Sequence, residues 1–575
     1  MSFGVSRFRR LLTVSCFSMA AASLAEVVDT AIAGQILGET ALGAIGLFWP
    51  CVEVLYFLST SLAGGTAVFY AMAAGRSDAK RMSHCFSNGL VSSILIGLAC
   101  ATGFWLFRDA AFAFFGADEA TFAYLRPYWN AYLLQAAIYP ACVYLNSLVS
   151  TDGDTRICGI AFLVDFSVNV IGSYALCSTI GVAGCALGTI AGSLAGLGIV
   201  FIHFFRSTNS LRFRFCFSPR ETLRWIAVDF PESGNSLMAA LVYIVMDKVV
   251  VSFFGSGCLP LMAVVVTTYS FMFFLYGIGN AMRPIVGVYW AEGNHVVVRR
   301  VMHDASRFAI GLGLGLTALM VTFPGIAVFV LGLDSSSLVR QAEIVVRIVS
   351  CSFVFFALCS LFSSYYILIE RLALALTLLV LSEAVMPLIG SLTGLWVAGF
   401  FGFWIGYALA APLTLVVVTL FIRGYRRERT FPLFLPKGCR GLRVWDFALK
   451  PESICETAQA VQKVLIVRGE KTGLALRASM LVEESLMAVC DCNEKGRFKA
   501  EVSLFIRDGV QLILRDDGKI RDLSRDLSGI DAVRGEVLGS SLKRLESRYC
   551  AVTTGTNRNA FVLRKPEKVW YNTNL

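Results

Sequence analysis

The sequence predicts an all-α polytopic membrane protein of about twelve transmembrane helices, followed by a small α/β domain at the C-terminal end. Three observations support this fold class. Of the 575 residues, 56% are hydrophobic and only 16% are charged, whereas a soluble domain carries about 25% charge. Apolar stretches long enough to cross about 30 Å of hydrocarbon recur as far as residue 422. After Arg429 the composition changes to a soluble pattern.

Each apolar stretch is long enough to form one membrane-crossing helix. The predicted spans are residues 11–33, 44–72, 85–107, 121–149, 158–177, 183–205, 227–253, 259–289, 308–331, 341–369, 372–394 and 397–422. The first span follows a group of arginines and imitates a secretory signal peptide. Its apolar run continues past Asp29 to Ala33, so we expect a retained helix.

Basic residues lie in alternate connections between the spans, as Lys80 and Arg81 do after the second span and Arg299 and Arg300 after the eighth. Positive residues stay on the cytoplasmic side of a membrane. We therefore expect both termini in the cytoplasm and the protein in the cell inner (plasma) membrane. The net charge of +10 reflects this orientation in the lipid bilayer, and we expect no nucleic-acid partner. The 17 cysteines are scattered, mostly inside apolar runs, and indicate small apolar side chains without a disulfide framework or a metal site.

The membrane part has the pattern of a duplication. Gly64-Gly65 in the second span leads into a basic loop, and Gly277-Ile278-Gly279 in the eighth span does the same. Repeats with a binding site at their interface are typical of transporters. The predicted parts are an N-lobe (1–207), a C-lobe (208–426), a linker (427–440) and a cytoplasmic domain (441–575).

Ionisable side chains inside membrane spans are costly, so each of them is a candidate functional residue. Asp29 lies near the end of the first span. Asp165, Asn169 and Ser173 are spaced i, i+4 and i+8 on the fifth span, which places them on one helical face. Oxygen atoms that converge there could hold Na⁺, or a carboxylate could hold a proton. Further candidates are Glu53, Asp247, Arg283 and Glu383.

For Asp247 we favour an ion pair with the adjacent Lys248 over a role in coupling.

Several motifs resemble the multidrug and toxic compound extrusion (MATE) family of transporters. They are Val28-Asp29-Thr30, Gly64-Gly65 followed by Ala74-Gly75-Arg76, the turn from Gly181 to Thr189, and the segment from Gly277 to Arg300. The resemblance covers residues 11 to about 424. It implies two six-helix lobes around a central cavity, and export of small organic, often cationic, molecules in exchange for Na⁺ or H⁺.

In one branch of that family, a cation site uses an Asp on helix one, an Asn and an Asp on helix five, and a Thr on helix six. The resemblance assigns these roles to Asp29, Asn169, Ser173 and Thr189. A serine thus replaces the second carboxylate, and we expect Asp165, one turn earlier, to substitute for it. Another branch carries a glutamate on helix seven, at about the position of Ala239. The coupling ion is therefore left open between Na⁺ and H⁺.

A second function remains open within the same superfamily. A lipid-linked oligosaccharide flippase would need several basic residues in its cavity to bind a pyrophosphate. Arg283 is the clearest arginine deep in a span, and one is thin support for such a site. We therefore favour the export of drug-like molecules.

The C-terminal segment alternates between strand and helix patterns. The expected elements are strand 442–449, helices 452–468 and 471–490, strands 498–507 and 510–515, helix 537–548, and strands 549–554 and 559–564.

Three motifs of this segment, at Glu483-Glu484, Asp516-Asp517-Gly518 and Leu538-Gly539, resemble the histidine-kinase-like ATPase fold of the anti-sigma-factor serine kinase type. The resemblance implies that Glu484 is the general base, that Asp516 and Gly518 receive the adenine of ATP, and that Gly539 belongs to the phosphate loop. Ala488 stands where the family has an Mg²⁺-binding Asn. We therefore expect a degenerate domain, catalytically weak or inactive, that serves regulation.

Two further function classes remain open. The helices could form a receptor whose C-terminal domain binds a cytoplasmic regulatory protein. Alternatively, the C-terminal domain could be an active enzyme, against which Ala488 argues. We favour a transporter that is not an enzyme.

Overall fold

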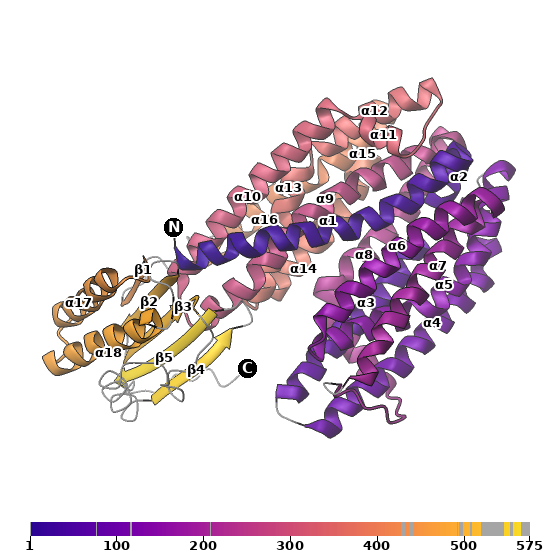
Figure 1. The fold of residues 1–575 in the computed structure, drawn as a ribbon. Helices are drawn as coiled ribbons and strands as arrows, with labels where there is room; N and C mark the ends of the chain where they lie inside the picture. Colours follow the sequence, from indigo (N-terminus) through magenta and orange to yellow (C-terminus); the bar gives the residue numbers. More distant parts are fainter. Residues whose placement is uncertain are drawn as a thin grey trace. The chain divides into compact units, whose positions relative to one another are not determined.

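The computed structural model describes most of the chain (Figure 1). The described residues are 2–75, 78–115, 118–206, 209–426, 432–435, 441–491, 493, 498–506, 509–518, 546–552 and 556–564. They form two compact units. One, which we call the sheet unit, consists of Met1–Ser15, Ile278–Arg307 and Ile422–Leu575, and the other, the helical unit, of Cys16–Gly277 and Phe308–Phe421.

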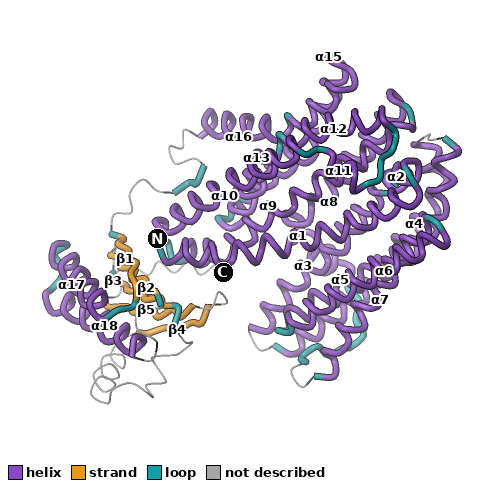
Figure 2. Tube along the Cα trace, turned by 45° about the horizontal axis from the view of Figure 1, so that its top comes forward, coloured by secondary structure: helices purple, strands orange, loops and turns teal. Residues whose placement is uncertain are grey.

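The helical unit is built from long helices joined by short turns (Figure 2). Its helices in the first half of the chain are α1 (Phe3–Leu37), α2 (Glu39–Gly46), α3 (Trp49–Gly75), α4 (Ala79–Phe115), α5 (Glu119–Thr151), α6 (Thr155–Ile180), α7 (Val182–Phe201), η1 (Ile202–Phe205) and α8 (Pro219–Phe254). Those in the second half are η2 (Ser256–Cys258), α9 (Leu259–Ala291), α10 (His295–Thr322), α11 (Gly325–Val330), α12 (Ser336–Ser350), α13 (Phe353–Leu368), α14 (Leu372–Val380), η3 (Leu381–Val385), α15 (Met386–Ala408) and α16 (Ala410–Arg426). Four of them, α1, α9, α10 and α16, continue into the sheet unit.

Nine of the helices in the described part of the chain are long and apolar enough to cross a membrane, or ten if the bent pair α12 and α13 forms one span. The protein is thus mostly helical and multi-pass, as the hydropathy predicts, and the number of about twelve spans stays a prediction. One reason for the different numbers is that Leu372–Ala408 counts as a single helix. The sequence divides it between two spans.

The helix α15 contains a break at Ala398 and Gly399, just after the gap between the predicted spans 372–394 and 397–422. Ala398 has φ −137° and ψ 21°, and Gly399 has φ 59°, a left-handed conformation that glycine adopts at little cost. The two halves then lie against each other through glycines. A Cβ added to Gly406 would lie 1.8 Å from the carbonyl oxygen of Gly390, and one added to Gly394 would lie 1.9 Å from that of Gly402. The chain therefore reverses direction within α15.

Several helices extend beyond the apolar spans. The largest difference is in α10, which begins at His295, whereas its apolar span is predicted to begin at residue 308. Hydropathy detects only the apolar part of a helix, and the polar turns from His295 to Arg307 are equally helical. In η3 the chain forms a π-helical turn around Glu383, an irregularity that hydropathy does not reveal.

The sheet unit contains a five-stranded sheet of strand order β1-β2-β3-β5-β4 in which all neighbours are antiparallel. Its elements are β1 (Leu442–Ala448), α17 (Pro451–Val467), α18 (Thr472–Asp491), β2 (Lys499–Ile506), β3 (Val510–Asp516), β4 (Glu546–Val552) and β5 (Thr556–Arg564). These confirm the predicted strands and the first two predicted helices within a few residues. The predicted helix 537–548 is wrong at its end, because Glu546, Ser547 and Arg548 pair with β5. Its remainder, like most of the predicted linker, lies outside the described residues.

The helices α17 and α18 cover one face of this sheet (Figure 1). Alternate residues of β2 and β3 point toward them, so that Val502, Leu504, Leu512 and Leu514 join the same core as the inner faces of both helices. Ala488 lies in this core and is fully buried. The intervening residues of the two strands point to the opposite face of the sheet.

The glycine contacts in α15 generate a stability prediction. We expect Gly406→Val to lower the apparent Tm of the detergent-purified protein, because overpacking a close helix contact costs about 1–3 kcal/mol. The matched control is Gly315→Val on α10, where an added Cβ meets nothing within 4 Å. Equal Tm values for both variants in a thermal unfolding assay would contradict the close packing of the two halves of α15.

Candidate functional site

A close contact between α6 and α7 prepares the first candidate site. The two helices form a hairpin whose turn contains Gly181 with φ 73°. Glycines of α7 then face α6. A Cβ on Gly188 would lie 2.3 Å from the backbone nitrogen of Ser173, and one on Gly192 would lie 2.6 Å from Asp165 Oδ1. Because these positions lack side chains, the backbones approach closely and the polar residues of α6 lie beside α7.

Asp29 on α1 contacts this hairpin through one of its two carboxylate oxygens. Asn169 Nδ2 donates to Asp29 Oδ2 over 3.2 Å, and Thr189 Oγ1 donates to the same oxygen over 2.8 Å. Ser173 Oγ in turn donates to Asn169 Oδ1 over 2.8 Å. Asp29 Oδ1 is buried and has no hydrogen-bond partner among the described residues. The structure thus brings Asp29, Asn169, Ser173 and Thr189 together.

Asp165 lies one turn before Asn169 on α6 and packs against Gly192 and Gly196 of α7. Within the described part of the chain, no hydrogen bond joins it to Asp29. It is therefore a neighbour of the Asp29 cluster and not a direct contact.

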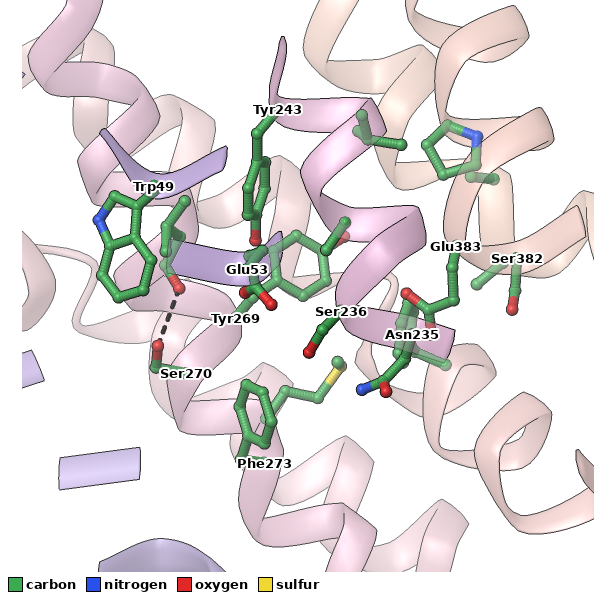
Figure 3. Close-up of a pocket in the computed structure, with 18 of the residues that line it drawn as sticks. Trp49, Glu53, Asn235, Ser236, Tyr243, Tyr269, Ser270, Phe273, Ser382 and Glu383 are labelled. Carbon is green, nitrogen blue, oxygen red and sulfur yellow. Dashed lines mark hydrogen bonds between the residues drawn. The ribbon is translucent and has the colours of Figure 1, made fainter. Parts of the chain in front are cut away.

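A larger cavity in the helical unit, with a volume of about 140 Å³, contains both Glu53 and Glu383. Figure 3 shows the two glutamates projecting into it, Glu53 from α3 and Glu383 from η3, with Asn235 and Ser236 of α8 nearby. Much of the remaining wall is aromatic, and these residues are Trp49, Tyr56, Tyr243, Tyr269, Phe273, Tyr276, Phe356 and Tyr407. Two acidic groups thus face an aromatic enclosure.

The sequence did not single out this aromatic wall. Tyr269, Phe273 and Tyr276 are spaced i, i+4 and i+7 on α9 and therefore share a helical face. That spacing is the one signal that could have indicated them. It is weak, because aromatic side chains at helical spacing also face lipid or neighbouring helices.

The cavity around Asp29 and the cavity around the two glutamates share part of their walls. The first has a volume of about 50 Å³ and is lined by Asp29, Tyr128, Tyr132 and Thr189. Trp49 and Tyr56 line both cavities. Trp49 and Tyr56 therefore connect the surroundings of Asp29 with the wall of the larger cavity.

Asp247 and Lys248 do not form the predicted ion pair. Lys248 Nζ donates to the backbone carbonyl oxygen of Phe114 and lies 5.3 Å from the centre of its ring. Asp247 is 1% exposed, and its Oδ2 has no hydrogen-bond partner among the described residues. The two side chains do not meet because adjacent residues of a helix point in different directions. Arg283 is half-buried on α9 in the sheet unit, and it is not among the described residues that line either cavity.

The residues singled out in the C-terminal domain lie at two places. Glu484 is half-buried on α18. Asp516 ends β3 and is 1% exposed; its Oδ1 accepts hydrogen bonds from the Gly518 backbone nitrogen over 3.0 Å and from Asn557 Nδ2 over 2.7 Å. Burial raises the pKa of the Asp516 carboxyl to about 6, although the bonds from Asn557 and Gly518 oppose that rise. Gly539 lies outside the described residues.

The long apolar helices and the enclosed polar and aromatic cavities define a multi-pass membrane transporter. The sequence model of the MatE family matches residues 15–175 and 234–393, which together are more than half of the chain. The protein belongs to this family. The two matched segments fit the predicted duplication, while the lobe boundary at residues 207 and 208 stays a prediction.

Solved structures show the same fold. One is the inward-facing conformation of a multidrug resistance MATE family transporter of the MOP superfamily, with 18% identity and a TM-score of 0.63 over 72% of this chain and 99% of that one. An outward-facing conformation has 20% identity and a TM-score of 0.57 over 74% and 98%. The MATE multidrug transporter DinF-BH has 20% identity and a TM-score of 0.61 over 75% and 97%. A comparison with curated protein sequences gives no match.

The Asp29 contacts predict an energetic coupling between α1 and α7. We expect Thr189→Val to destabilise the protein by about 1.5–3 kcal/mol, because it removes a hydrogen bond to a buried carboxylate. Most of that loss should disappear in an Asp29→Asn background, as a double-mutant cycle on detergent-purified protein would show. Thr179→Val is the control, since Thr179 Oγ1 donates only to carbonyls of its own exposed helix end. Additive effects of the two site substitutions would argue against the contact.

Proposed function

We propose that this protein is a secondary active antiporter that exports small organic molecules across the plasma membrane in exchange for Na⁺ or H⁺. Both termini would lie in the cytoplasm, as the distribution of basic residues suggests. The observation that best supports the proposal is the pair of adjoining cavities, one holding Asp29 and the other holding Glu53 and Glu383, with Trp49 and Tyr56 in both walls.

Asp29 is the proposed coupling carboxylate. Its Oδ2 already accepts two hydrogen bonds, whereas its buried Oδ1 has no partner among the residues described. A proton on that oxygen would remove the charge, and a Na⁺ ion would neutralise it with oxygen ligands. Asn169, Ser173 and Thr189 hold the carboxylate in place, and Asp165 adds a second negative charge one turn away. Either ion makes the occupied site less costly to bury.

The larger cavity is the proposed substrate site. Its glutamates attract positive charge, and its aromatic rings can stack on apolar groups or contact a cation through their faces. An organic cation with an aromatic or apolar body fits both features. Binding of the ion at Asp29 and binding of the substrate in the larger cavity would then alternate as the two halves of the membrane part move relative to each other.

A lipid-linked oligosaccharide flippase is less well supported. Among the described residues that line the larger cavity there is no lysine or arginine. A pyrophosphate would therefore meet two carboxylates and no counter-charge.

For the C-terminal domain we propose a degenerate ATPase-like regulatory module. Asp516 with Gly518 resembles an adenine-binding turn, so ATP remains the ligand to test, with Glu484 as the base if any catalysis survives. Ala488 is packed in the domain core and cannot ligate Mg²⁺, which disfavours phosphoryl transfer. Capture of a cytoplasmic regulatory protein by the full-length protein, without gradient-driven transport, would favour the receptor alternative instead.

The role of Asp29 is tested by Asp29→Asn in reconstituted vesicles. We expect gradient-driven efflux of a fluorescent organic cation to fall at least tenfold, because the amide can neither take up a proton nor balance Na⁺ at that position. Imposing a Na⁺ gradient and a pH gradient separately on the parent protein identifies the ion. Membrane insertion and yield of the variant should stay unchanged, and full gradient-driven efflux by Asp29→Asn would eliminate this role.

The role of the larger cavity is tested by Glu53→Gln and Glu383→Gln. We expect each to raise the KM for a cationic substrate about tenfold, which corresponds to about 1.4 kcal/mol of lost attraction. The KM for a neutral analogue should change little. Glu119→Gln is the matched control, because Glu119 is exposed at the start of α5, outside the predicted spans and the two cavities. If the control and the cavity variants have the same KM, the substrate does not bind beside these glutamates.

A further inference from the structure

The face of the C-terminal sheet opposite α17 and α18 is not open to solvent. Glu501, Ser503 and Arg515 point to this outer face because they alternate with the core residues of β2 and β3. A free two-layer domain would leave such polar side chains hydrated. Glu501 and Ser503 are nevertheless fully buried, and Arg515 is 3% exposed. Another part of the sheet unit must therefore cover this face.

The end of α9 and the turn into α10 provide the cover. Tyr289 Oη donates to Glu501 Oε2 over 2.9 Å, and the Arg515 guanidinium lies 4.4 Å from the centre of the Tyr289 ring. In the turn, Asn294 Nδ2 donates to Ser503 Oγ over 3.0 Å, and Asn294 is fully buried.

Apolar contacts surround these polar ones. Val296 of α10 packs against a small cluster on the outer face of the sheet, which consists of Leu442, Phe505, Ile513 and Ala560. Both kinds of contact join the sheet to the same short stretch of α9 and α10.

Four charges at this contact compensate one another. Glu292, which follows α9, pairs with Arg515 and Arg558 from the sheet, and Arg515 Nη1 also lies 3.1 Å from Glu501 Oε1. Burial raises the pKa of the Glu501 carboxyl to about 7, although the charge of Arg515 and the bonds from Tyr289 and Ser503 oppose that rise. Separating a buried pair without replacing its partner is strongly unfavourable. Loss of one partner of this network therefore leaves a buried charge uncompensated.

The first turns of α1 touch the same sheet near its edge strand. The Phe3 backbone nitrogen donates to Asp446 Oδ1 over 2.7 Å, and Arg300 Nη1 of α10 donates to the other oxygen of that carboxylate over 2.9 Å. Arg7 Nη2 lies 3.4 Å from Asp517 Oδ2.

The start of α1 is also tied directly to α10. Arg9 donates from two nitrogens to the Asp304 carboxylate over 2.7 and 2.8 Å. The sheet and this pair thus hold α1 and α10 side by side (Figure 1).

We propose that the C-terminal domain is an intramolecular clamp that fastens the ends of α1, α9 and α10 together and restrains the movement of the transporter's two halves. By the predicted duplication, α1 belongs to the N-lobe, whereas α9 and α10 belong to the C-lobe. Helices fastened at one end cannot separate there, so release of the clamp permits the opening at this side. The effect on rate rests on the proposed transport function, whereas docking of the domain does not.

The test uses the full-length protein with spin labels on His303→Cys of α10 and Lys463→Cys of α17, both exposed positions, in a Cys351→Ser background. We expect one narrow distance distribution for the parent. Glu292→Gln should add a longer component with at least a tenfold larger undocked population, and efflux at a fixed gradient should rise severalfold. Glu292→Asp, which keeps the charge, should retain most docking, and Glu119→Gln, at an exposed position outside the predicted spans, should behave like the parent.

The outcomes distinguish failure of the docking, of the restraint on movement and of the proposed transport function. An unchanged distance distribution in Glu292→Gln and in a second variant, Asn294→Ala, would overturn the docking. Undocking without any change in efflux rate would overturn the restraint on movement. If the parent protein shows no gradient-driven efflux while its distance distribution is narrow, the proposed transport function fails and the docking stands. Elution as a single monodisperse species checks that each variant is folded.

Discussion

A carboxylate buried among apolar helices is costly unless polar atoms replace the water that it loses. At Asp29 this compensation is incomplete. Two donors form hydrogen bonds with Oδ2, whereas Oδ1 has no partner among the described residues. The donors can reach it only because glycines of α7, such as Gly188, let the backbone of α6 come close. The packing of α1, α6 and α7 thus has to compensate the buried charge of Asp29. An ion or a proton at Oδ1 would complete this compensation.

The sequence predicted most of the fold and part of the site. Hydropathy located the helices because apolar composition alone decides what lipid accepts, and the spacing of Asn169 and Ser173 on one face of α6 predicted their proximity. Thr189 came only from the family resemblance, because its contact with Asp29 joins residues 160 positions apart. The tyrosines around Glu383 gave only the weak signal of their helical spacing, since lipid and an aromatic cavity favour similar side chains.

Other features depend on tertiary packing and were also beyond the sequence. The reversal at Gly399 lies two residues into the predicted span 397–422, close to the gap that hydropathy placed after residue 394, whereas the π-turn that carries Glu383 has no comparable signal. The adjacent charges at Asp247 and Lys248 suggested a pair that helix geometry prevents. Likewise, Glu501 alternates with the core residues of β2, and only the structure shows that the second face of the sheet, to which it points, is covered.

The helix α1 runs without interruption from Phe3 to Leu37, so the residues that touch the sheet and the carboxylate Asp29 belong to the same helix. Thermodynamic linkage is reciprocal for binding equilibria. If the position of the C-terminal domain alters the affinity of Asp29 for the proposed coupling ion, then occupancy by that ion must alter, by the same factor, the equilibrium constant for docking of the domain. The transporter would in that case also report the electrochemical gradient to whatever recognises the released domain.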